Sequence, residues 1–120
     1  MGLSTHVLDT MHGCPAAGMP VQLFVTEGPE QTLGAGLRRF VLNSDGRNPD
    51  GLLLDSSSLQ RGTYCLVFDV AAYFAAREVA LPSPSFLNRV RIDFGIADPA
   101  QHYHVPLLVS PWSYSTYRGS

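Results

Sequence analysis

Histidines are the residues of this chain best suited to acid–base chemistry, and two of them are two positions apart. His102 and His104 flank Tyr103 in the stretch HYHVPLL, and His6 lies in LSTHVLD. Alternate residues of a β-strand point to the same side of the sheet, so we expect both imidazoles of HYHVPLL on one face and Tyr103 on the other. Imidazole changes charge near neutral pH, which suits proton transfer. The spacing alone also fits a solvent-exposed face that happens to carry histidines, or a metal site, for which it supplies no third ligand.

Other candidate residues lie in turns and in the last four positions. Arg47 follows the tight-turn sequence Ser-Asp-Gly, and the chain ends in Tyr-Arg-Gly-Ser. Taken alone, each of these residues has a purely structural interpretation. Arg47 would be a charged loop residue, Arg118 a charge at a strand edge, and Ser120 only the last residue. His12, in the turn-like MHGCP, is expected to be exposed. The chain contains no GxSxG, P-loop, HExxH or GxGxxG motif, so the residues alone do not indicate a substrate.

The elements that must position these residues are mainly β-strands. Apolar residues alternate along several short runs: Val21, Leu23 and Val25; Tyr64, Leu66, Phe68 and Val70; Phe86, Val90, Ile92, Phe94 and Ile96. Turn sequences rich in Gly, Pro, Asn and Asp separate the runs. One stretch, VAAYFAARE over 70–78, predicts a short helix with Asp69 as its cap and Pro82 beyond its end. Seven or eight short strands with frequent turns favour a β-sandwich.

Composition narrows the class of protein. The 120 residues fit one domain, 1–120, and only 15% are charged, against a norm of roughly 25%, which favours surface hidden in an oligomer. The net charge of −2 and the absence of a basic run argue against nucleic acid as a partner. Cys14 and Cys65 form no CxxC pair; the sequence does not exclude a disulfide, but free thiols in a reducing compartment fit better. Neither a signal peptide nor a membrane-spanning stretch is present, so we expect a soluble, cytoplasmic protein with no membrane partner.

Three longer stretches together resemble a known family. LSTHVLDTMHGCPAAGMPVQL, SDGR and HYHVPLLVSPWSYSTYRGS resemble the transthyretin-like family and, within it, the 5-hydroxyisourate hydrolases. The resemblance runs from Leu3 to Ser120; YRGS is highly specific to the hydrolase branch, and THVLDT with PAAG is moderately specific. It implies an all-β fold, a two-sheet transthyretin-like (prealbumin-like) β-sandwich of about eight strands with one short helix. It also implies a homotetramer, a dimer of dimers, with the active sites in the central channel.

The resemblance assigns roles residue by residue. It implies catalytic roles for His6 in STHVLD, Arg47 in SDGR, His104 directly before VPLL, and Ser120 at the chain end. The substrate-binding residues that it implies are Tyr117, Arg118, Gly119 and the less strongly indicated His102. In such proteins the chain end folds into the pocket, so we expect that nothing can follow it. The resemblance implies neither a metal nor another cofactor.

The implied reaction is hydrolytic opening of the six-membered ring of 5-hydroxyisourate, with 2-oxo-4-hydroxy-4-carboxy-5-ureidoimidazoline as the product, a step of urate breakdown. His6 and His104 would activate water and deliver a proton, in an order that the sequence leaves open, and Arg47 would lower the pKa of a nearby imidazole. Transthyretin, the hormone-carrying branch, has lysine, glutamate and threonine at these three positions and lacks YRGS. Cys14 departs from the lysine or other polar residue of many members. The alternatives are a non-catalytic small-molecule carrier and a metal-binding or structural sandwich.

Overall fold

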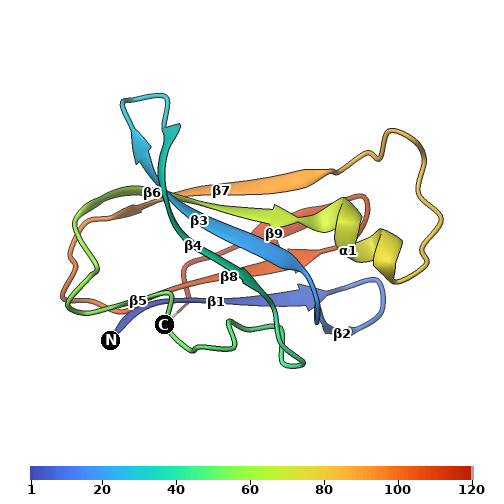
Figure 1. Cartoon of the computed structure of the whole chain (residues 1–120), viewed down its shortest axis with the longest axis horizontal. Helices are drawn as coiled ribbons and strands as arrows, with labels where there is room; N and C mark the ends of the chain where they lie inside the picture. Colours follow the sequence, from blue (N-terminus) through green and yellow to red (C-terminus); the bar gives the residue numbers. More distant parts are fainter. Residues whose placement is uncertain (120) are drawn as a thin grey trace.

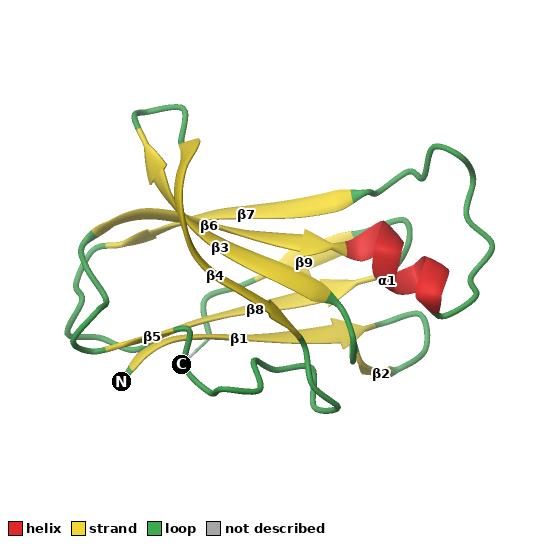
Figure 2. Cartoon of the chain, in the orientation of Figure 1, coloured by secondary structure: helices red, strands yellow, loops and turns green. Residues whose placement is uncertain are grey.

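Two β-sheets pack face to face, and a single short helix lies at one end of the sandwich (Figures 1 and 2). The computed structural model describes residues 1–119. In the first sheet the strands follow the order β2-β1-β8-β9, with β5 also pairing with β1: β1 (Gly2–Asp9), β2 (Cys14–Pro15), β5 (Leu54–Asp55), β8 (Tyr103–Val109) and β9 (Tyr114–Thr116). In the second sheet the order is β4-β3-β6-β7: β3 (Pro20–Glu27), β4 (Thr32–Val41), β6 (Gly62–Asp69) and β7 (Arg89–Ile96). This arrangement confirms the predicted two-sheet sandwich; the described strands exceed the predicted eight because β2 and β5 have two residues each, too few for a periodic pattern.

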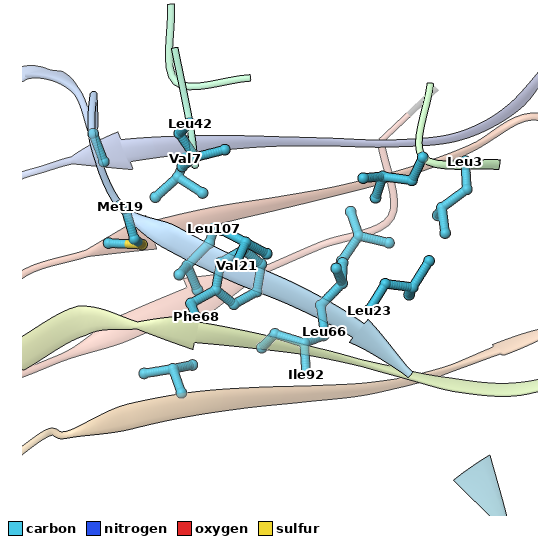
Figure 3. Close-up of a cluster of buried hydrophobic side chains, with 14 of the residues drawn as sticks. Leu3, Val7, Met19, Val21, Leu23, Leu42, Leu66, Phe68, Ile92 and Leu107 are labelled. Carbon is cyan, nitrogen blue, oxygen red and sulfur yellow. The ribbon is translucent and has the colours of Figure 1, made fainter. Parts of the chain in front are cut away.

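Apolar side chains between the sheets form the core (Figure 3). Leu66 and Phe68 of β6 are fully buried, as their alternation predicted. Burial of one such side chain stabilises the fold by about 1.5–3 kcal/mol. The prediction for β3 holds for Val21 and Leu23 but not fully for Val25, which is only partly buried. The pairing of β3 with β4 shifts register directly after Leu23, and a shift in register changes which side chains face the core.

The helix is shorter than predicted and begins differently. α1 spans Val70–Ala76, and Glu78, which we expected inside it, has a positive φ of 62° that no right-handed helix can accommodate. The proposed cap was wrong: the Asp69 side chain makes no capping hydrogen bond. Instead the chain passes directly from β6 into α1, and Tyr73 and Phe74 bury themselves against the core. Packing, rather than a cap, therefore holds this short helix.

The strand β7 begins later than its apolar pattern suggested. Val90, Ile92 and Ile96 are buried as predicted, but the strand starts at Arg89 and Phe86 is 71% exposed. The Phe86 ring lies beside that of Trp112, with centroids 6.4 Å apart. The prediction that Phe86 belongs to the buried face of this strand was wrong, because alternation in sequence continues past the point where backbone pairing ends.

A buried carboxylate ties the end of β1 to the helix. Asp9 is fully buried, and its side chain accepts hydrogen bonds from the Tyr73 hydroxyl at 2.7 Å and from the His12 backbone N–H at 3.0 Å. Asp9 also accepts a 2.6 Å hydrogen bond from ring Nδ1 of His12. Burial acts to raise the pKa of Asp9, but these hydrogen bonds prevail and lower it. His12 is therefore not merely an exposed turn residue: it helps to satisfy a buried charge and is separate from the other histidines.

Candidate active site

The imidazoles lie on the outer face of the β1–β8 sheet. These two strands run parallel, with Ser4 opposite His104 and His6 opposite Pro106. The alternate residues Thr5 and Val105 face inward and are buried, whereas His6 and His104 are partly exposed. The parallel pairing is what brings residues nearly a hundred positions apart onto one surface (Figure 1).

Both histidines of HYHVPLL reach the same serine, which confirms that they share one side. Ser4 Oγ lies 2.8 Å from Nδ1 of His104 and 3.3 Å from Nε2 of His102. Tyr103, between them, is buried on the opposite face. Sequence reasoning missed Ser4, although a signal existed: it lies two positions before His6 on the same strand and therefore on the same face.

A tight loop carries Arg47 to the same surface. Val7 of β1 donates its N–H to the carbonyl of Gly46 at 2.9 Å, which fastens the loop directly beside His6. Within the loop the Asn43 side chain accepts the Arg47 N–H at 3.1 Å, and Asn43 donates its own N–H to the Arg47 carbonyl at 2.9 Å. Gly46 has a φ of +72°, and a Cβ there would lie 2.5 Å from the Val7 carbonyl oxygen. The approach that positions Arg47 therefore requires glycine at this position.

The electrostatics of the surface favour the neutral form of both imidazoles. Burial lowers the pKa of His6 and of His104 below the ordinary 6.5, and the positive charge of Arg47 lowers each further. At His104 the neighbouring imidazoles of His6 and His102 act in the same direction. The Asp45 backbone and carboxylate oppose the shift at His6, and the Ser4 backbone opposes it at His104. His6, His104 and Arg47 therefore lie close enough for their charges to influence one another. Arg47 lowers the pKa of both imidazoles, which is the direction predicted from the sequence.

The chain end folds back onto His104. Gly119 donates its N–H to the His104 carbonyl at 2.8 Å, and the two residues form an isolated antiparallel bridge. A Cβ on Gly119 would lie 2.6 Å from Cδ2 of the His104 ring, so only glycine fits this close approach. Ser120, the remaining predicted catalytic residue, lies outside the described residues. Tyr117, 61% exposed, precedes this contact.

Arg118 fastens the tail rather than standing alone at a strand edge. Its guanidinium donates to the Gln101 side chain at 2.9 Å and to the His102 carbonyl at 3.2 Å. The same group lies 4.2 Å from the centre of the Tyr103 ring. An open hollow of about 520 Å³ adjoins these contacts and is lined by Met1, Ala100, Gln101, His102, Arg118 and Gly119. The tail therefore forms one wall of a hollow that reaches His102.

Residues 1–119 can also be described in terms of metal ligands, cysteine pairing and membrane-spanning helices. Within residues 1–119, no three His, Cys, Asp or Glu side chains are grouped so that they could hold a metal ion. Cys14 and Cys65 are free thiols, as expected. Over the same residues, no helix has the length and apolar character needed to cross a membrane.

The fold and the site together define a class of protein, namely a two-sheet β-sandwich that carries imidazoles on the outer face of one sheet. Residues 3–119 match the model of the HIUase/Transthyretin family, and the chain belongs to this family. It is 48% identical to a 5-hydroxyisourate hydrolase of Pseudomonas aeruginosa over 98% of this chain and 90% of that protein. A crystal structure of (S)-allantoin synthase superposes with a TM-score of 0.90 at 44% identity; the match covers 99% of this chain and 43% of that one. A 5-hydroxyisourate hydrolase of Klebsiella pneumoniae, 37% identical, superposes over all of both chains with a TM-score of 0.79.

Proposed function

We propose that this protein is a hydrolase that opens the six-membered ring of 5-hydroxyisourate. Water adds to the carbonyl carbon of a cyclic amide, the C–N bond breaks, and the product is 2-oxo-4-hydroxy-4-carboxy-5-ureidoimidazoline. The observation that most supports the proposal is that burial, and then the positive charge of Arg47, lowers the pKa of two partly buried imidazoles, His6 and His104. The names of the relatives at 48% and 37% identity support the same reaction.

The chemistry needs a proton acceptor for water, a donor for the departing nitrogen and a group that stabilises negative charge. We assign the acceptor and donor roles to His6 and His104, since a neutral imidazole can either accept or donate at physiological pH, and such catalysis contributes about 10²–10⁴-fold. Arg47 has a planar fork of donors that suits a carbonyl or an anionic substrate. The substrate-binding residues in this proposal are Tyr117, Arg118, Gly119 and His102, with Ser120 completing the catalytic set. No cofactor enters the proposed reaction.

We also propose that the whole chain is one domain that assembles as a homotetramer, a dimer of dimers, with the sites in a central channel. Several large apolar side chains are exposed in the described protomer, among them Trp112, Tyr114 and Tyr117, and such surface favours association. A cytoplasmic location agrees with two free thiols. Sedimentation at micromolar concentration tests the assembly, and a monomer would contradict the proposed channel.

Turnover of freshly made substrate tests the function. Urate oxidase converts urate to 5-hydroxyisourate in the cuvette, and its spectroscopic decay is followed with and without the protein, with the spontaneous decay subtracted. We expect decay to accelerate in proportion to protein concentration. Binding of the substrate or a purine analogue without acceleration would support a carrier instead. Metal analysis of untagged protein tests the metal-binding alternative, which stoichiometric metal would support.

A further inference from the structure

A chain of hydrogen bonds links the start of β1 to the His104 ring. The Gly2 backbone N–H donates to Nδ1 of His102 at 3.2 Å. Nε2 of the same ring lies 3.3 Å from Ser4 Oγ, and this hydroxyl lies 2.8 Å from Nδ1 of His104. All of these groups are partly buried, so water competes less for them than it would at an exposed surface.

The donor and acceptor in each hydrogen bond of this chain follow from the bond between Gly2 and His102. A backbone N–H can only donate, so Nδ1 of His102 must accept and carry no proton. A neutral His102 then carries its proton on Nε2 and donates it to Ser4 Oγ. The Ser4 hydroxyl has one proton, and the remaining partner for it is Nδ1 of His104. Nδ1 of His104 therefore accepts, and the proton of the neutral ring lies on Nε2.

We propose that Ser4 is a positioning residue that passes the tautomer set at His102 on to His104, so that His104 presents Nε2–H to the substrate. A ring in this tautomer donates a hydrogen bond through Nε2 and accepts nothing there. It stabilises negative charge that develops on the substrate but does not take the proton of the attacking water. That proton passes to His6, the other imidazole beside Arg47. This division of roles rests on the proposed hydrolase function, whereas the tautomer itself does not.

One alternative arrangement would give the opposite tautomer of His104. A hydrogen bond with the Ser4 backbone acts to raise the pKa of the His104 imidazole. A bond from Nδ1–H to the Ser4 carbonyl would place the proton on Nδ1 and leave Nε2 as an acceptor. The hydroxyl at 2.8 Å favours the first arrangement, because Nδ1 can hold only one of these partners along its lone-pair direction. The two arrangements give opposite tautomers and opposite roles to His104.

The tautomer can be read without any substrate. Long-range ¹H–¹⁵N spectra of histidine-labelled protein, recorded where the imidazoles are neutral, distinguish Nε2–H from Nδ1–H rings, and a His104→Gln variant assigns the signal. We expect His104 as the Nε2–H tautomer in the unsubstituted protein and in Ser4→Thr, which keeps the hydroxyl. In Ser4→Ala we expect a mixture of tautomers. An Nδ1–H tautomer of His104 in the unsubstituted protein overturns the proposal.

Kinetics test whether the relay matters to the reaction. In Ser4→Ala we expect kcat to fall roughly 10- to 100-fold, the scale for removing a group that orients a functional histidine, with little change in KM. Ser4→Thr should restore most of kcat. Thr63→Val is a matched control in the sheet that does not carry the imidazoles. There Thr63 of β6 accepts a 2.7 Å hydroxyl hydrogen bond from Thr26 of the neighbouring β3, so its loss tests stability alone, and kcat should stay unchanged.

A double-substitution cycle tests whether His102 acts through Ser4. If the groups form one relay, His102→Phe should by itself shift part of His104 to the other tautomer, and adding it to Ser4→Ala should change the tautomer mixture no further. Additive shifts of the tautomer in the double variant, or an unchanged kcat in Ser4→Ala, overturn the relay. A protein that opens no 5-hydroxyisourate but shows the Nε2–H tautomer refutes the proposed function and leaves the tautomer inference standing.

Discussion

The Gly119→Ala substitution should show whether activity depends on the position of the chain end, because it displaces the tail without removing any functional group. The new Cβ would lie 2.6 Å from Cδ2 of the His104 ring, whereas ordinary contact begins at 3.4 Å. Either the ring or the tail must therefore move by about 0.8 Å, since carbon atoms at the shorter distance repel strongly. A misplacement of about 1 Å in a positioned group can cost about 10²-fold in rate, so we expect kcat/KM to fall roughly 10- to 100-fold.

The assay is the initial rate of ring opening on freshly generated 5-hydroxyisourate, with thermal unfolding measured in parallel. Gly119 has no positive φ, so alanine brings no backbone strain and the melting temperature should change little. Gly95→Ala is the matched control, because a Cβ there meets no heavy atom within 4 Å among the described residues. A Gly119→Ala protein as active as the Gly95→Ala protein would refute the packing of the tail against His104.

Three further predictions follow from the same surface. His6→Ala and His104→Ala should each lower kcat by about 10²–10⁴-fold with the fold retained, as measured by turnover and circular dichroism; near-normal turnover in both would remove the assigned roles. In Arg47→Gln the pKa of both imidazoles should rise toward 6.5, so the acid limb of the kcat/KM profile, expected below 6.5 in the unsubstituted enzyme, should move to higher pH; an unmoved limb would contradict this. Gly46→Ala forces a Cβ to within 2.5 Å of the Val7 carbonyl at a φ of +72°, so urea unfolding should show a loss of about 1–3 kcal/mol together with lost activity; unchanged stability would mean that the loop is not pressed against β1.

The sequence predicted the layers of the fold better than the boundaries of its elements. The alternating residues Tyr64, Leu66 and Phe68 and Val90, Ile92 and Ile96 are all buried, because one face of each strand must lie against the other sheet. The same signal misplaced Phe86 and the end of the helix. The start of β7 depends on backbone pairing with β6, and the positive φ of Glu78 depends on how the chain leaves the core. Neither leaves a periodic trace in the sequence.

The sequence indicated the residue types of the candidate site but not their contacts. The pattern HYH indicated two imidazoles on one face, and the resemblance to the hydrolase branch selected His6 and Arg47. Neither predicted that Ser4 would join the two imidazoles of HYH, since this contact exists only because β1 and β8 pair in parallel with Ser4 opposite His104. Register between distant strands is a tertiary property, and local sequence does not specify it.

The arrangement explains why the site needs three distant segments. An imidazole serves as a proton acceptor only while neutral, and a nearby permanent cation keeps it so at lower pH, but a flexible arginine side chain near an exposed histidine would be screened by water. Here the Arg47 loop is fastened to β1 by the bond between Val7 and Gly46, and His104 is held from two sides by Ser4 and Gly119. Each contact involves backbone or a short side chain, so the Arg47 backbone and the His104 ring lose little conformational entropy when substrate arrives. The rigid sheet thus supplies the preorganisation that such electrostatic control requires, and a carrier that transfers no protons would have no use for it.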